Sequence, residues 1–206
     1  MPRIAEVRDA AEPNSEGQRA RHVRMLAAAS ELATDHELAR VQMQEVARRA
    51  DVAIATLYRY FPSKTHLFVA VMLEEIRHIQ EALERRPPDG VVGTDAIYAV
   101  LVRATRSLLR RPLLANAMIQ SNASANSAVV PDTAKVEQEF WAILLTAAGV
   151  SEPTDDDSTA VRLLTQLWLG VLQSCLNDRI TVPDAEADIR SACDLLLVRM
   201  SVHTTG

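Results

Sequence analysis

The chain has 206 residues, 48% of them hydrophobic and only 4% aromatic, and carries a formal net charge of −5. This apolar content excludes a largely disordered chain, and the low glycine count beside abundant alanine and leucine favours an all-α fold over a β-sandwich or barrel. Because no apolar run is long enough to span a bilayer and no signal-peptide pattern opens the chain, we expect a cytoplasmic protein with no membrane partner.

Charge is unevenly distributed along the chain. Residues 1–66 hold ten Lys/Arg and nine Asp/Glu, whereas residues 67–206 hold twelve and eighteen. Phosphate binding depends on the local patch of charge and not on the total. An acidic protein can therefore still bind DNA through its N-terminal third.

The first elements are a tail and an amphipathic helix. Residues 1–14 are charged and aperiodic, which predicts a flexible tail. Ser15 and Gln18 have the spacing of a capping box at the start of a helix. Apolar or small residues then recur at helical spacing and predict its buried face: Val23, Leu26, Ala27, Ser30 and Ala33.

Two short helices follow, over residues 42–50 and about 53–61, with a tight turn at Asp51-Val52 between them. This arrangement predicts a helix-turn-helix, in which the second helix lies in the major groove of DNA. Pro62 ends that helix, and Ser63 caps a long fourth helix that continues to a break at residues 87–90. We interpret residues 15–66 as one three-helix DNA-binding domain.

The outer face of the predicted helix-turn-helix carries side chains suited to DNA. Hydroxyl groups and cations can bind phosphates or base edges. Tyr58 and Tyr60 cannot both face inward beside Leu57 and Phe61, so at least one large aromatic side chain is displayed, which argues against two merely packed helices. The residues predicted from these patterns to contact DNA are Arg19, Arg21, Gln44, Ala53, Thr56, Tyr58, Arg59, Tyr60 and Lys64.

The segments Val46-Ala47, Ala50-Asp51-Val52 and Thr56-Leu57-Tyr58-Arg59-Tyr60-Phe61-Pro62-Ser63-Lys64 resemble the DNA-binding domain of the tetracycline-repressor (TetR) family, with a match over residues 19–79. The resemblance implies a homodimer on a near-palindromic operator and a variable helical domain that binds a small effector. Three positions depart from the pattern: Ala55 replaces a usual Gly, Ala53 a capping Ser or Thr, and Gln42 a usual Thr. Alanine is a poor cap, at a cost of about 1 kcal/mol. Gln42 completes the predicted DNA-binding set.

Further segments resemble a branch of this family that regulates steroid catabolism in actinobacteria. They include residues 41–43, 49–53, 111–114 and 152–154, and the likeness is weaker after residue 90. It implies an apolar, steroid-derived or acyl-CoA-derived effector that releases a repressor from its operator. A regulator or activator without a ligand, and a helical interaction module that binds no DNA, are the alternative interpretations.

Helical spacing continues beyond residue 90 and gives about nine helices, with residues 67–203 as an effector-binding and dimerisation domain. The helix from about Asp155 to Leu176 is apolar on more than one side and must be covered twice. Periodicity alone leaves a dimer and a thick-cored monomer equally open, and the family resemblance favours the dimer. Large apolar residues predicted to bind the effector are Met118, Phe140, Trp141, Leu144, Trp168 and Val171. Those predicted for dimerisation are Leu164, Cys175, Ile189, Leu196 and Met200.

Signatures of catalysis and metal binding are missing from the sequence. The five histidines are scattered, and Asp155–Asp157 is interpreted as a charge run at a helix N-terminus and not as a metal site. Cys175 and Cys193 lie among apolar residues and are expected to be reduced core residues. Without a phosphate-binding loop or a nucleophile motif, we expect no enzyme and no cofactor.

Overall fold

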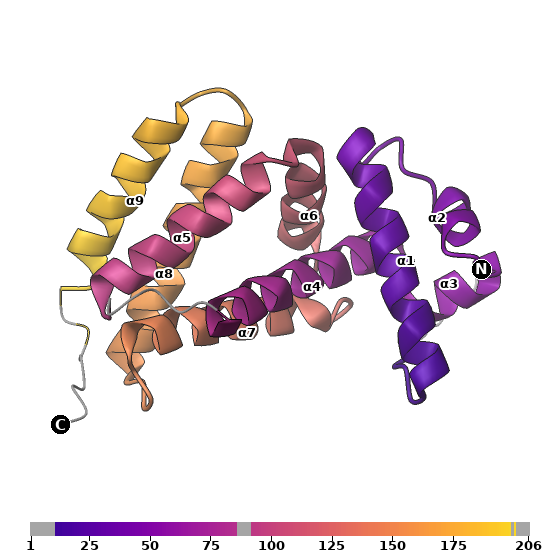
Figure 1. Ribbon diagram of the computed structural model, residues 1–206, viewed down its shortest axis with the longest axis horizontal. Coiled ribbons are helices and arrows are strands. Elements are labelled where there is room, and N and C mark those ends of the chain that lie inside the picture. Colours follow the sequence, from indigo (N-terminus) through magenta and orange to yellow (C-terminus); the bar gives the residue numbers. More distant parts are fainter. Residues whose placement is uncertain (1–10, 86–91, 199, 201–206) are drawn as a thin grey trace, which may run out of the picture. The chain divides into compact units, whose positions relative to one another are not determined.

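The computed structural model describes residues 11–85, 92–198 and 200. Within them the chain forms nine α-helices and no strand (Figure 1), which confirms the predicted all-α class. The helices are α1 (Glu16–Asp35), α2 (Met43–Arg49), α3 (Ile54–Tyr60), α4 (Lys64–Arg85), α5 (Thr94–Leu109), α6 (Pro112–Ser124), α7 (Asp132–Ala148), α8 (Asp155–Leu176) and α9 (Val182–Leu196). No described helix is both long enough and apolar enough to cross a membrane.

The chain divides into two compact units. The first contains Met1–Glu75 and Leu113–Val136, and the second contains Ile76–Pro112 and Glu137–Gly206. Their boundaries fall within α4, at the start of α6 and within α7, so each unit is built from separate stretches of sequence. The linear division after residue 66 stays a prediction. Most of the expected tail, the expected break at residues 87–90 and the end of the chain after Met200 lie outside the described residues.

Helix α1 begins at Ser15, whose hydroxyl accepts a hydrogen bond from the Gln18 N–H at 3.3 Å. The Gln18 side chain accepts from the Asn14 N–H at 2.8 Å and not from Ser15, so the expected reciprocal cap is displaced by one residue. The buried face consists of Met25, Leu26, Ala28, Ala29, Leu32 and Ala33. The predicted face was therefore wrong at Val23, which is 54% exposed, and at Ala27. The larger Met25 and Leu32 bury more apolar surface when their side of the helix faces the core.

Three helices end at a residue in the left-handed conformation. Gly149, expected just past α7, has φ of 78° and confirms that prediction. At the ends of α2 and α8 the same position is occupied by Asp51, with φ of 52°, and Asp178, with φ of 55°. After α2 the Val52 N–H donates to the Ala47 carbonyl at 3.0 Å, which is the longer bond of a Schellman motif. These ends fix the turns that follow each helix.

In the second unit, α5, α8 and α9 lie side by side (Figure 1). Two exposed ion pairs join α5 to α9. Arg106 Nε donates to Glu186 Oε1 at 2.6 Å, and Arg190 Nη1 donates to Asp95 Oδ1 at the same distance. The Arg190 guanidinium also lies 3.7 Å from the centre of the Tyr98 ring, a cation–π contact.

Helices α8 and α9 both start with a capping box. Thr154 and Asp157 bond reciprocally at the start of α8, and Thr181 and Asp184 do so at the start of α9. The Thr181 hydroxyl and N–H hold the pKa of Asp184 below its usual value. Asp155–Asp157 thus lie in the first turn of a helix, as expected, where carboxylates interact favourably with the free N–H groups. Within the described residues no cluster of His, Cys, Asp and Glu could hold a metal ion.

Candidate nucleic-acid interface and C-terminal core

A helix-turn-helix is formed by α2, the turn at residues 50–53 and α3. Val46, Ala47 and Leu57 are buried between the helices, and Val52 is half-buried. Neither helix has a side-chain cap at its start, since Gln42 and Ala53 make no capping hydrogen bond. The two departures from the family pattern therefore leave the first N–H groups of both helices without a side-chain acceptor.

The outer face of α3 displays the polar residues predicted to contact DNA. Tyr58 is 48% exposed, Arg59 and Ala53 are also exposed, and Thr56 is half-buried. Gln42 and Gln44 are exposed at the start of α2. The large aromatic side chain that this helix displays is thus Tyr58.

Tyr60, also predicted for the DNA face, is only 3% exposed. Its ring packs edge-on against His22, with ring centres 5.8 Å apart, and lies tilted against Phe61, with ring centres 6.5 Å apart. Arg59 Nη2 donates to the Tyr60 hydroxyl at 3.3 Å, and its guanidinium lies 5.1 Å from the centre of the ring. Tyr60 is therefore part of the domain core and holds Arg59 against α3, which differs from the role expected from the sequence.

The side chain of Lys64, at the start of α4, is also held in place by a hydrogen bond. Its Nζ donates to the Leu38 carbonyl at 2.9 Å and so ties the connection between α1 and α2 to α4. His66, half a turn later, has Nδ1 2.8 Å from Ser63 Oγ and Nε2 2.9 Å from the Val129 carbonyl oxygen. An ammonium group has three N–H donors, so Lys64 can bind a phosphate while keeping this contact.

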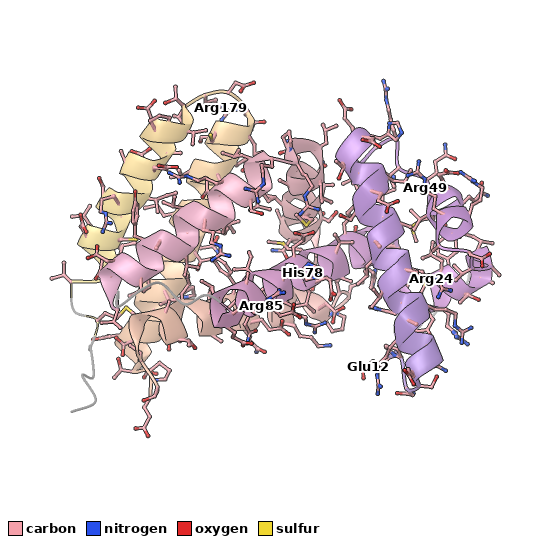
Figure 2. The ribbon with its side chains drawn as sticks, in the orientation of Figure 1. Glu12, Arg24, Arg49, His78, Arg85 and Arg179 are labelled. Carbon is pink, nitrogen blue, oxygen red and sulfur yellow. The ribbon has the colours of Figure 1, made fainter. Side chains whose placement is uncertain are left out.

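The arginines of α1 differ in their surroundings. Arg19 and Arg21 are exposed, and Arg21 Nε donates to the Gly17 carbonyl at 3.1 Å. Arg24, labelled in Figure 2, donates from Nε to the Ala50 carbonyl at 3.3 Å and so binds the end of α2. Arg24 is exposed like Arg19 and Arg21, but through this bond it also helps to orient the helix-turn-helix.

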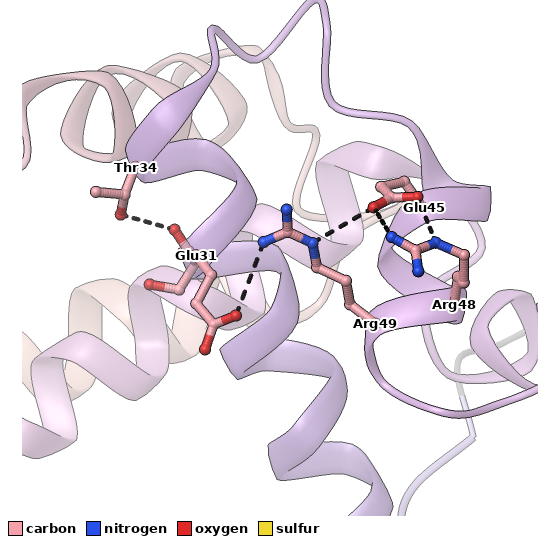
Figure 3. Close-up of polar contacts among 6 residues, drawn as sticks. Glu31, Thr34, Glu45, Arg48 and Arg49 are labelled. Carbon is pink, nitrogen blue, oxygen red and sulfur yellow. Dashed lines mark hydrogen bonds and ion pairs between the residues drawn. The ribbon is translucent and has the colours of Figure 1, made fainter.

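The sequence patterns missed an exposed group of charges on α2 (Figure 3). Arg48 Nε donates to Glu45 Oε2 at 2.8 Å, and Arg49 Nε donates to Glu45 Oε1 at 3.4 Å. Arg49 also lies 3.9 Å from Glu31 of α1. The Arg48 guanidinium holds the pKa of Glu45 at about 2. The adjacent Arg48 and Arg49 could have indicated this group in the sequence, but two neighbouring arginines on a helix usually only face the solvent.

Of the residues predicted to bind the effector, five lie in the second unit, and Met118 does not. Phe140 of α7 stacks on Trp168 of α8, with ring centres 5.0 Å apart. Phe140, Leu144 and Trp168 are buried, whereas Trp141 and Val171 are half-buried. Met118 is buried in the first unit.

The residues predicted for dimerisation divide into two groups. Leu164, Cys175 and Ile189 are buried within the unit itself, while Leu196 and Met200 are half-buried. Burial also raises the pKa of Cys175, and it raises the pKa of Cys193 to about 11.

The exposed apolar residues on α8 and α9 are different from those predicted for dimerisation: Leu163 and Leu167 on α8, Leu195 at the end of α9, and Val198 after it. Leu195 and Val198 are 77% and 78% exposed. They line a groove of about 460 Å³ together with Leu163, Leu196 and Met200.

The helix-turn-helix and the helices that follow it match known families in the expected order. The family described as "Bacterial regulatory proteins, tetR family" matches residues 25–71, and "Tetracyclin repressor-like, C-terminal domain" matches residues 90–196. The chain belongs to the TetR family of bacterial transcriptional regulators. This membership confirms the family resemblance and the order of the DNA-binding and C-terminal domains.

Two relatives have the same printed name, HTH-type transcriptional repressor KstR. The protein from Mycobacterium tuberculosis is 33% identical over 186 residues, which cover 90% of this chain and 84% of that protein. The protein from Rhodococcus jostii is 33% identical over 184 residues, which cover 89% of this chain and 86% of that protein. The resemblance to this branch of the family is thereby confirmed.

Solved structures support the same fold. A TetR transcriptional regulator from Rhodococcus sp. RHA1 is 63% identical, covers 90% of this chain and 100% of its own, and has a TM-score of 0.87. Thermus thermophilus FadR, solved in complex with lauroyl-CoA, covers 88% of this chain and 95% of its own with a TM-score of 0.67. At 18% identity FadR shows only that the fold is shared.

Proposed function

We propose that this protein is a dimeric repressor in the cytoplasm that binds a near-palindromic operator and is released by a small apolar effector. The observation that carries the proposal is the exposed polar face of α3, with Tyr58 at its centre, in the helix-turn-helix of a TetR-family chain. The two relatives named as repressors support the sign of the regulation.

The proposed DNA-binding surface combines both helices of the helix-turn-helix. Thr56, Tyr58 and Arg59 supply the groove-facing side chains of α3. Gln42 and Gln44 at the start of α2, with Lys64 at the start of α4, supply donors for phosphates. The exposed Arg19 and Arg21 add positive charge beside this surface. Tyr60 contributes indirectly, because it holds Arg59 in place.

The proposed dimer interface is the exposed apolar face of α8 and α9. Leu163 and Leu167 are four residues apart on α8 and so share one side of that helix. The exposed Leu195 and Val198 extend this face beyond α9. A second copy that covers these residues would make the four-helix contact expected of a two-fold interface. In this proposal Leu164, Cys175 and Ile189 support the face from inside the protomer.

The proposed effector site lies in the second unit near α7 and α8. Phe140 and Trp168 form its aromatic floor, and the half-buried Trp141 and Val171 lie closer to the surface. Large apolar and flat side chains with few polar groups suit a hydrophobic ligand. The FadR structure, in which a protein of the same fold binds lauroyl-CoA, suggests a fatty acyl thioester as one probe.

DNA binding is tested by selecting genomic fragments with the purified full-length protein and measuring affinity for the recovered palindrome by fluorescence anisotropy. Tyr58→Ala should weaken binding about tenfold, since one hydrogen bond to a charged phosphate is lost. Arg59→Ala should weaken it to a similar extent and reduce the dependence on salt.

Arg103→Ala is the matched control, because Arg103 is an exposed arginine on α5 in the other unit. This variant should change the affinity less than twofold. If no palindrome is recovered, or if the Tyr58 and Arg59 variants also bind like the wild type, the proposed DNA-binding surface is wrong.

A further inference from the structure

The chain has two tryptophans, and their indole N–H groups differ in one respect. Trp168 Nε1 donates to Thr105 Oγ1 at 2.8 Å in a buried site. Trp141 Nε1 is buried as well but has no hydrogen-bond partner. Among the described residues, Asn122 Oδ1 is the other buried side-chain atom without a partner, and it belongs to the first unit.

A buried N–H without an acceptor destabilises the fold, because its bond to water has been lost and not replaced. Native proteins keep few such groups, and each one needs a physical explanation. The same unit does satisfy its other indole, through a threonine whose hydroxyl in turn donates to the Leu101 carbonyl at 2.8 Å. The unpaired indole is therefore a specific feature of Trp141 and not of the core as a whole.

The position of Trp141 suits a ligand contact. Its neighbour in the chain, Phe140, stacks on Trp168, and Leu144, one turn later on α7, is fully buried. Trp141 itself is half-buried although its Nε1 is covered. The indole thus combines a flat apolar surface, partly open, with one donor that is not used inside the protein.

We propose that Trp141 Nε1 is the donor that recognises the effector, and that the effector carries a carbonyl oxygen on its apolar part. The inference rests on the proposed function and adds the chemistry that its effector must have. A site built around a buried donor rejects an analogue without the acceptor, because the donor is then left unpaired in the complex as well.

Two kinds of carbonyl on an apolar group are compared, that of a fatty acyl thioester and that of a ring ketone. Lauroyl-CoA and its thioether S-dodecyl-CoA differ only in the carbonyl group. The steroid 5α-cholestan-3-one and the hydrocarbon 5α-cholestane, delivered in cyclodextrin, form the second pair. The pair whose two members differ more in affinity for the wild-type protein identifies which kind of carbonyl the site binds.

The first measurement uses the ligand-free full-length protein with ¹⁵N-labelled tryptophan. Two indole cross-peaks are expected, assigned with Trp141→Phe and Trp168→Phe. The Trp168 proton should resonate downfield as a hydrogen-bonded group, and the Trp141 proton should not. Trp168→Phe should lower the urea midpoint of unfolding, whereas Trp141→Phe should leave it unchanged or raise it. A downfield Trp141 proton in the free protein would overturn the proposal.

The second measurement adds the probes. A carbonyl probe should move the Trp141 cross-peak downfield and bind the wild type about tenfold more tightly than its carbonyl-free partner. Trp141→Phe should abolish that tenfold preference, so that a carbonyl probe and its carbonyl-free partner bind the variant with equal affinity.

The proposed effector function and the proposed role of Trp141 Nε1 are contradicted by different results. If the wild type and Trp141→Phe show the same preference for the carbonyl, this inference is wrong while the effector function stands. If the wild type binds the recovered operator but neither carbonyl probe, the proposed effector function fails together with the inference.

Discussion

Thr105 accepts the indole N–H of Trp168 at 2.8 Å, and both residues are buried. The Thr105 hydroxyl then donates to the Leu101 carbonyl, so the polar atoms of this contact between α5 and α8 are paired inside an apolar core. A buried polar pair of this kind is weak in net stabilisation but costly to break from one side.

Replacing Thr105 with Val keeps the shape of the side chain and removes the acceptor. Thr105→Val should therefore lower the free energy of unfolding by about 1–3 kcal/mol, because the Trp168 N–H is left buried without a partner. Urea denaturation of the single variants and of Thr105→Val/Trp168→Phe measures the coupling. The double variant should be more stable than the sum of the single effects predicts, and simple additivity would contradict the paired arrangement.

Leu57 and Tyr58 are neighbours on α3 with opposite roles. Leu57 is fully buried, so Leu57→Ala should destabilise the protein by about 2–5 kcal/mol through the cavity it leaves. Tyr58→Ala removes an exposed ring and should change the stability by about 0.5 kcal/mol or less. Thermal unfolding of both variants checks this contrast, and equal losses of stability would mean that the orientation of α3 is wrong.

Asp51 ends α2 in the left-handed conformation, with φ of 52°. A residue with a Cβ is strained there, while glycine is not, although glycine gains more entropy in the unfolded chain. Asp51→Gly should therefore raise the free energy of unfolding by about 0.5 kcal/mol, the difference between the relieved strain and the added chain entropy. Asp178→Gly, at the matching position after α8, should do the same. Asp51→Ala keeps the strain and serves as the control, so a gain with Ala as large as that with Gly would refute this explanation.

Glu45 is ionised over most of the pH range, since Arg48 holds its pKa at about 2 against an ordinary value of 4.5. Because the pKa is lowered in the folded protein, the ion pair stabilises the fold above about pH 4.5, and this contribution is lost as the pH falls towards 2. Carboxyl NMR should give a midpoint near 2 at low salt. Arg48→Gln should return the midpoint towards the ordinary value, and an unchanged midpoint would exclude Arg48 as the cause.

The same carboxylate lies on the proposed DNA-binding side of the protein and partly neutralises Arg48 and Arg49. Glu45→Gln should tighten operator binding a few-fold and make it more sensitive to salt, since more positive charge faces the phosphates. Glu186→Gln, which removes an ion-paired carboxylate from α9, is the matched control and should leave the affinity unchanged. An unchanged affinity and salt dependence for the Glu45 variant would place α2 away from the DNA.

The exposed apolar face of α8 and α9 predicts the oligomeric state. Leu167→Glu or Leu195→Glu should shift the protein from dimer to monomer, because a charge cannot be buried unpaired in the interface. Sedimentation velocity measures the shift. Val23→Glu, an exposed valine on α1, should remain dimeric. A monomeric wild type, or leucine variants that stay dimeric, would contradict the proposed interface.

Much of this protein follows from short-range sequence signals. The end of α3 and the start of α4 were predictable because Pro62 cannot continue a helix and Ser63 caps the next one, as its bond to the His66 N–H confirms. Gly149 marked the end of α7 for a similar local reason. The segments Val46-Ala47, Ala50-Asp51-Val52 and Thr56–Lys64 were sufficient to predict the family, since a helix-turn-helix is encoded within one short stretch of sequence.

Only the tertiary structure decided which side of each helix is covered. Sequence spacing showed that one of Tyr58 and Tyr60 must be exposed, but the contact of Tyr60 with His22, 38 residues earlier in the chain, decided which. Likewise, α8 has apolar residues on two sides, and its packing against α5 and α9 buries Leu164 and Cys175 while leaving Leu163 and Leu167 exposed. Helical periodicity gives the spacing of a stripe but not its direction in space. That direction depends on which distant side chains fill the remaining volume of the core.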